Sequence, residues 1–144
     1  MALIDELKAK SNSIDDNKNA VMKEIKDYFN KYLHSEQFEK YIKSHGDLQK
    51  RRINIWVEYW QHSAGCSGTN FGINNCRFYI NKDDEYSYNT KYKGVDVSKC
   101  QLEIGAMLYY LVRDVMEELG FTYQGTEDKM CWLGFYDKEL TYSW

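Results

Sequence analysis

The sequence predicts an α+β protein with two layers, in which a mainly antiparallel sheet of about four to six strands packs against helices. Three observations predict this class: helical spacing of apolar residues in the first 46 residues, a switch to two-residue alternation at Ile53, and one capped helix over about 98–119. Short, hairpin-length connections favour antiparallel pairing. The 144 residues fit a single domain, 1–144, with a helical part in 1–46 and a sheet with one helix in 53–144.

Two helices are expected in the helical part. Ser13 is an N-cap candidate with Asp16 in the first turn, so the longer helix is expected to begin there. The residues before Ser13 would form a short separate helix or a frayed end. The second helix is expected to begin at Ser35 and to end at Gly46, where a glycine commonly adopts the left-handed conformation.

The run "INIWVEYW" alternates strictly and predicts a strand with one packed face and one aromatic-rich face. The first face carries Ile53, Ile55, Val57 and Tyr59, and the second carries Asn54, Trp56, Glu58 and Trp60. The run 71–81 is expected to be its partner strand, and a weaker strand is expected within 85–94.

A third helix and a strand-rich tail follow. Ser98 and Gln101 match a capping box, and an apolar stripe then ends at Gly120, a typical residue after a helix. The tail predicts two or three strands, with turns at Gly125–Asp128 and at Asp137 and Lys138. Its middle strand, apolar on both faces, is expected to be central in the sheet.

Composition excludes several classes of function. The net charge is −3, with 11 Lys/Arg against 9 Asp/Glu in residues 1–52 and 8 against 13 in residues 53–144, so the sheet-rich half is acidic. The only tight basic run is too short for a nucleic-acid footprint. No apolar run is long enough to span a membrane, and the N-terminus lacks the order of a signal peptide. We therefore expect a cytoplasmic protein with reduced cysteines, no cofactor and no metal.

The run "HSAGCSGTN" at residues 62–70 is expected to be a hairpin loop, because its residues are those that build turns in a chain without proline. Two chemical alternatives stay open. Cys66 is a weak candidate nucleophile with His62 as its base, although a strand rather than a helix follows it. The backbone N–H groups of the loop could instead bind an anion or nucleotide, aided by Arg77 on the neighbouring strand; the loop residues concerned are Gly65, Ser67, Gly68 and Thr69. A metal site there ranks lowest because the ligand spacing fits no standard module.

The aromatic face of the first strand is the strongest candidate for function. Trp56 and Trp60 lie four residues apart on it, and Tyr79 is expected across from them. Burial beneath the N-terminal helices would explain these residues without any function. Otherwise they form an exposed aromatic patch of the kind that marks interfaces.

These observations predict a small non-enzymatic binding protein that acts through protein–protein contacts. In composition only, the chain resembles small phage or mobile-element proteins that inhibit host nucleases and defence complexes, including anti-CRISPR proteins. An acidic surface would let it compete with nucleic acid on such a partner. The alternative is a small-molecule or nucleotide-binding module, or a cysteine-dependent enzyme, that uses residues 62–70. An edge strand near the C-terminus could also form a homodimer.

Overall fold

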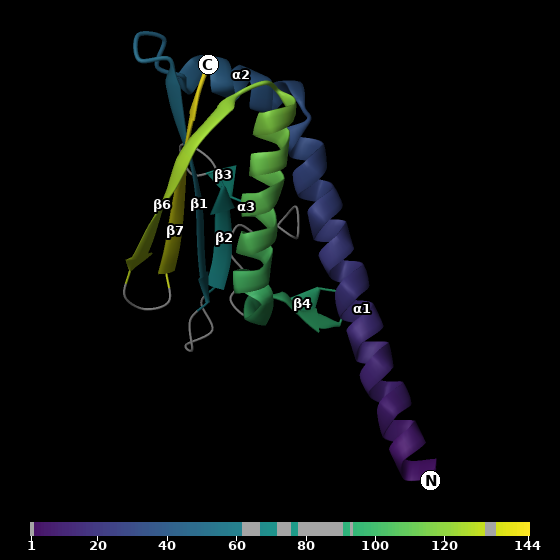
Figure 1. The fold of residues 1–144 in the computed structure, drawn as a ribbon. Helices are drawn as coiled ribbons and strands as arrows, with labels where there is room; N and C mark the ends of the chain where they lie inside the picture. The colour runs from purple at the N-terminus through teal and green to yellow at the C-terminus, as the bar shows by residue number, and fades with distance from the viewer. Residues whose placement is uncertain (1, 62–66, 72–75, 78–90, 93, 132–134) are drawn as a thin grey trace.

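The computed structural model describes residues 2–61, 67–71, 76–77, 91–92, 94–131 and 135–144 (Figure 1). The helices are α1 (Ala2–Leu33), α2 (Glu36–His45) and α3 (Gln101–Glu118), the last preceded by a 3₁₀ turn, η1 (Val97–Cys100). The strands are β1 (Arg52–Gln61), β2 (Ser67–Phe71), β3 (Cys76–Arg77), β4 (Lys91–Tyr92), β5 (Val95–Asp96), β6 (Thr122–Cys131) and β7 (Phe135–Ser143). The α+β class is confirmed.

The main sheet has the strand order β3-β2-β1-β7-β6, and β4 and β5 form a separate small hairpin. Every neighbouring pair in the main sheet is antiparallel, as predicted. The long strands are β1, β7 and β6, whereas β2 and β3 are short. Helix α3 lies along one face of this sheet, and α1 packs on α3 (Figure 1).

The core lies between the sheet, α3 and the second half of α1. Alternate residues of β1 point into it, because successive side chains of a strand face opposite ways. The sheet contributes Ile53, Ile55, Val57, Leu140 and Tyr142, α3 contributes Ile104, Leu108, Leu111, Val112, Val115 and Met116, and α1 contributes Val21, Ile25, Phe29 and Leu33. The apolar stripe predicted for the third helix is therefore the packed one, except for its last residue, Leu119, which is exposed.

Helix α1 is continuous from Ala2 to Leu33, so the predicted start at Ser13 is wrong. No glycine or proline occurs before Gly46, and nothing in the local sequence interrupts the helix. Ser35 is the N-cap of α2, as predicted, because its side chain accepts a hydrogen bond from the Phe38 N–H. Gly46 ends α2 with φ −64° rather than in the predicted left-handed conformation.

The two ends of α3 differ in how well the sequence predicts them. The capping box at Ser98 is wrong: the N-cap is Cys100, without a side-chain hydrogen bond, and Ser98 lies in the 3₁₀ turn η1. Such turns commonly precede α-helices. The predicted glycine at the other end is confirmed, with Gly120 at φ +90°. The Gly120 N–H donates to Glu117 O and the Phe121 N–H to Met116 O, which is a Schellman motif.

The predicted turns of the tail are wrong. Gly125 and Asp128 lie inside β6, and Asp137 and Lys138 lie inside β7. The Gly125 signal marks a register shift between Tyr123 and Gly125 instead, where φ is +146°. Of the expected middle strand, Cys131 is the last residue of β6 and Phe135 is the first residue of β7, and the two are paired; residues 132–134 lie outside the described residues.

The partner of β1 on its other side also differs from the prediction. Ser67–Phe71 form β2 and pair with β1, with Trp60 opposite Gly68 and Gln61 opposite Ser67. The predicted loop 62–70 is therefore wrong over 67–70, which lie in β2, and residues 62–66 lie outside the described residues. Of the expected strand 71–81, Phe71 is the last residue of β2 and Cys76–Arg77 form β3.

Candidate functional site

The face of the sheet that points away from α3 carries Trp56. Its neighbours Ile55 and Val57 are fully buried under α3, whereas Trp56 is half-buried and Asn54 is exposed on the opposite face. No helix of the described part of the chain lies on this second face (Figure 1). The sequence allowed burial of Trp56 beneath the N-terminal helices as an explanation without any function, and that explanation is therefore wrong. We call this second face the open face.

Two carboxylates lie beside Trp56 across the strands. Glu139 of β7 is directly opposite Trp56, and Glu127 of β6 is directly opposite Glu139. Like charges in directly opposite positions destabilise a sheet, by roughly 0.2–1 kcal/mol relative to neutral pairs. The register thus places two carboxylates in line with a tryptophan on this face. We call these three residues the Trp56 row.

The polar residues around the Trp56 row bond to one another. Thr141 Oγ1 donates to Asn54 Oδ1 at 3.0 Å, and Gln124 Nε2 donates to Ser143 Oγ at 2.6 Å. These hydrogen bonds satisfy side chains on β1, β7 and β6 within the face itself. The exposed Glu127 carboxylate and the part of the Trp56 ring that is accessible are then groups that can receive a partner. An aromatic ring beside carboxylates suits a basic side chain, through cation–π and charge-assisted contacts.

The structure describes some of the other predicted site residues and not the rest. Trp60 lies on β1 opposite Phe135, and Arg77 lies in β3 opposite Asn70. The candidate anion-binding residues Ser67, Gly68 and Thr69 lie in β2, whereas Gly65 lies outside the described residues. Cys66, His62 and Tyr79 also lie outside the described residues. The loop alternatives therefore stay predictions.

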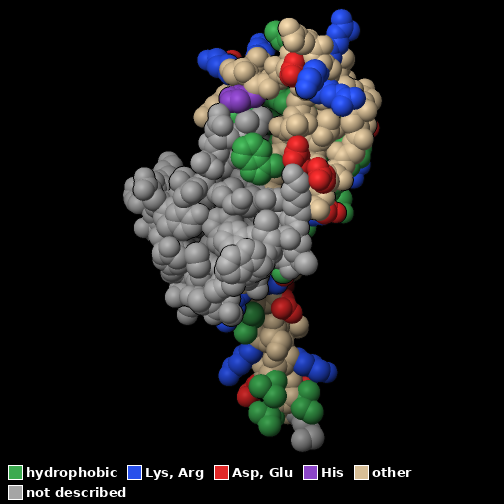
Figure 2. Space-filling model, turned by 90° about the vertical axis from the view of Figure 1, so that its left-hand side faces the viewer, with side chains coloured by type: hydrophobic (Ala, Val, Ile, Leu, Met, Phe, Trp, Pro, Cys, Tyr) green, Lys and Arg blue, Asp and Glu red, His purple; other side chains and the backbone are tan. Residues whose placement is uncertain are grey.

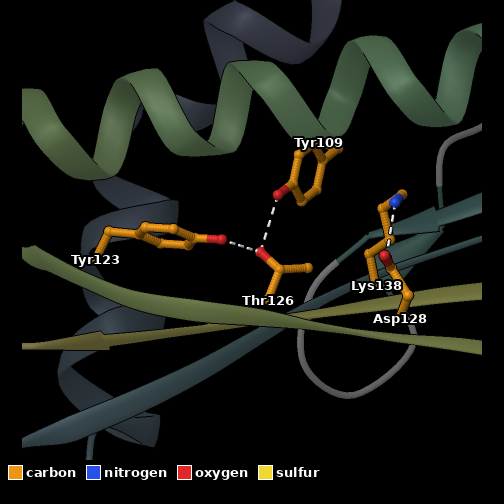
Figure 3. Close-up of polar contacts among 5 residues, drawn as sticks. All are labelled: Tyr109, Tyr123, Thr126, Asp128 and Lys138. Atoms are coloured by element: carbon orange, nitrogen blue, oxygen red, sulfur yellow. Dashed lines mark hydrogen bonds and ion pairs between the residues drawn. The ribbon is translucent and has the colours of Figure 1, made fainter.

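A second cluster, on the helix-facing side of the sheet, was not predicted from the sequence. Tyr109 of α3 and Tyr123 of β6 point toward Thr126 from two sides, as Figure 3 shows. The hydroxyls of Tyr109 and Thr126 are 2.8 Å apart, and the Tyr123 hydroxyl also bonds to Thr126. The Arg113 guanidinium lies 4.4 Å from the centre of the Tyr123 ring and 5.9 Å from that of Tyr109.

Two further residues complete this tyrosine cluster. Lys138 donates to Asp128 at 2.7 Å and lies 5.1 Å from the centre of the Tyr109 ring. Tyr142 is buried, and its hydroxyl has no hydrogen-bond partner among the described residues. Burial raises the pKa of Tyr142 to about 12, although the nearby Arg113 charge lowers it. These contacts tie α3 to the edge of the sheet, and the Tyr109–Arg113 spacing of four residues was the sequence signal for them.

Other sequence candidates have structural roles. His34 donates from Nδ1 to the Asn30 carbonyl oxygen, 2.7 Å away, and its Nε2 lies 3.0 Å from Glu118 Oε2, so it joins the C-terminal ends of α1 and α3. Cys100 is a buried free thiol, and burial raises its pKa. Within the described ranges, no group of His, Cys, Asp and Glu side chains could hold a metal ion. No helix in that part of the chain is long and apolar enough to cross a membrane.

Comparisons of the chain with protein-family models, with curated proteins and with solved structures find no match. The open face and the residues upon it are therefore the basis for a functional proposal.

Proposed function

We propose that this is a non-enzymatic binding protein whose open face docks on a basic surface of a protein partner. The observation that carries the proposal is the Trp56 row, a partly exposed tryptophan in register with Glu139 and Glu127. Tryptophan is among the residues that dominate binding energy at interfaces. The carboxylates beside it favour a partner that presents Lys or Arg.

The proposal takes the fold to be two-layered, with about four to six strands. The helices then occupy one face of the sheet and leave the other for the partner. It also places the protein in the cytoplasm, where its cysteines stay reduced.

The sharper form of the proposal is an inhibitor of a nuclease or defence complex, of the phage or mobile-element kind. Proteins that bind nucleic acid present basic grooves, and an acidic face competes for such a groove. The excess of acidic residues in 53–144, 13 against 8 basic, supports this choice. Added DNA should then displace the protein from its partner.

The experiment compares variants for binding to a purified partner that is first captured from a bacterial lysate. Trp56→Ala should weaken binding about 30-fold or more, the typical loss at a hot-spot tryptophan. Glu127→Lys should weaken it by reversing a charge, with the larger effect at low salt. Tyr110→Ala is the matched control, because Tyr110 is an aromatic residue exposed on α3, away from the open face. Equal binding by Trp56→Ala and the wild type would overturn the proposal.

A further inference from the structure

Helix α1 has a buried half and an exposed half. Val21, Ile25, Phe29 and Leu33 are buried, whereas every residue from 2 to 17 is exposed. Lys18, at the boundary, donates to Glu103 Oε1 of α3 at 3.0 Å. Figure 1 shows the first half extending beyond the rest of the protein. We call residues 2–17 the arm; they measure about 24 Å along the helix axis.

The arm carries an apolar stripe in line with the packed face of α1. Leu3, Leu7 and Ile14 are 64%, 55% and 69% exposed. Ile14 and Leu7 precede the buried Val21 by seven and fourteen residues, and a seven-residue step turns a helix by only about 20° from the same direction. The face that α1 packs on α3 therefore continues into solvent. Figure 2 shows hydrophobic side chains gathered at the end of the arm, with Lys side chains on either side.

Such an arm needs a packing surface. A helix of this length is marginal in water by itself, because most helical stability in proteins comes from packing of an apolar face. Single exposed leucines are ordinary, but an exposed apolar stripe at helical spacing is typical of helix pairing.

Two charges of the arm, Lys8 and Asp15, are complementary to a second copy in the antiparallel direction. Lys8 and Asp15 lie seven residues apart and so on the same flank of the stripe. A twofold axis near residue 11 sets Leu7 opposite Ile14 of the second copy. The same axis brings Lys8 beside Asp15 of the second copy, and it does so twice. Asp15 interacts electrostatically with Lys18 on the same helix, and in the described part of the chain neither Lys8 nor Asp15 is in an ion pair shorter than 4.0 Å.

The other candidate for self-association, the edge strand β6, is less suitable. It is the last strand of the sheet and presents one unpaired edge within the described part. Its register shift at Tyr123 and Gly125 and its adjacent acids Glu127 and Asp128 are the features that block edge-to-edge pairing in natural sheets.

We propose that the chain forms a reversible homodimer in which two arms pair antiparallel, with Leu7 packed on Ile14 and Lys8 paired with Asp15 of the second copy. The antiparallel direction keeps the two bodies at opposite ends of the pair. Since arms of this length bury less than a standard interface, the dimer is a weak one that depends on concentration. This surface is separate from the open face, so it does not depend on the proposed function.

Sedimentation velocity of the full chain over a concentration series tests the dimer. The wild type should associate, and Leu7→Glu should remain monomeric. Lys8→Glu and Asp15→Lys should each weaken the dimer about 5- to 30-fold, because each creates two like-charge pairs. Lys23→Glu, a charge reversal on α1 outside the arm, should have no effect. Thermal unfolding should be the same for all of these variants at concentrations where each is monomeric.

Mixing is the decisive part of the experiment. A one-to-one mixture of the Lys8→Glu and Asp15→Lys proteins should form a heterodimer at least as tight as the wild-type dimer, because each copy then supplies the charge that the other needs. The double variant should also regain self-association. A monomeric wild type, a dimer that survives Leu7→Glu, or a mixture that associates no better than its components would each overturn the proposal.

Discussion

At the scale of single residues, the tyrosine cluster places two buried hydroxyls in different circumstances. Tyr109 shares a hydrogen bond with Thr126, whereas the Tyr142 hydroxyl has no hydrogen-bond partner among the described residues. Burial of a hydroxyl without a partner costs about 1–3 kcal/mol, and a hydrogen bond offsets that cost. The two tyrosines therefore respond differently to removal of the oxygen.

We predict that Tyr142→Phe leaves the free energy of unfolding unchanged or raises it by up to about 1 kcal/mol. Tyr109→Phe should lower it by about 1 kcal/mol, since Thr126 then loses a partner. Urea unfolding of both variants measures this difference. A larger loss for Tyr142→Phe than for Tyr109→Phe would mean that the Tyr142 hydroxyl is bonded in solution.

Gly46 is required for space rather than for its backbone angles. A Cβ there would lie 3.0 Å from Trp144 Cη2 and 3.2 Å from the Ile42 carbonyl oxygen. We predict that Gly46→Ala lowers the free energy of unfolding by about 1–3 kcal/mol, the usual cost of overpacking.

Gly120 is the control for this prediction, because its φ is +90° and a Cβ there would have nothing within 4 Å. Asn tolerates that conformation better than Ala. Gly120→Asn should therefore be more stable than Gly120→Ala, whereas Gly46→Asn should be no better than Gly46→Ala. Urea unfolding of the four variants decides, and recovery at Gly46 with Asn would show that its space is not the constraint.

At the scale of elements, His34 connects the ends of two helices. The Asn30 carbonyl, and then the Glu118 carboxylate, raise the pKa of His34 above 6.5. A raised pKa means that the folded state binds the proton more tightly than the unfolded state. The stabilisation is therefore fully present below about pH 6.5 and is lost as pH rises through the raised pKa.

We predict that His34→Gln removes this fall in stability, which urea unfolding measures between about pH 6 and pH 8. The effect is small because the imidazole is largely exposed. Glu118→Gln should remove only part of it, since the Asn30 carbonyl is the larger cause. An unchanged pH dependence in His34→Gln would assign the slope to other groups.

The ends of the helices and strands show which sequence signals were sufficient to predict where an element begins or ends. Ser35 and Gly120 were predicted correctly, because each completes its hydrogen bonds within a few residues of sequence. Ser13 and Ser98 are serines like Ser35, but neither caps a helix: Ser13 lies inside α1, and the N-cap of α3 is Cys100. A turn was predicted at Gly125, but this residue pairs with β7, and the glycine marks a register shift inside β6. Local chemistry predicts an end only where no longer-range pairing competes with it.

At the scale of the whole molecule, the two faces of β1 have different roles in stability. Ile55 is fully buried under α3, and its neighbour Trp56 lies half-buried on the open face. Truncation of a buried Ile costs about 2–5 kcal/mol, because it leaves a cavity in a packed core. Half-burial of a large side chain contributes only about 1 kcal/mol.

We predict that Ile55→Ala lowers the free energy of unfolding by about 2–5 kcal/mol and that Trp56→Ala lowers it by about 1 kcal/mol. Chemical unfolding monitored by circular dichroism checks both values. Equal losses would mean that Trp56 is packed as a core residue, and the open face would then be covered.

The sequence by itself determined the α+β class, the antiparallel strands, the two faces of β1 and the apolar stripe of α3, because side-chain periodicity follows directly from backbone geometry. It also singled out Trp56. Only the tertiary structure decided that Trp56 faces away from the helices, that Glu139 and Glu127 lie beside it, and that the arm leaves the body at Lys18. These depend on strand register and on which helix face finds a neighbour, and both are set by contacts between residues far apart in the chain.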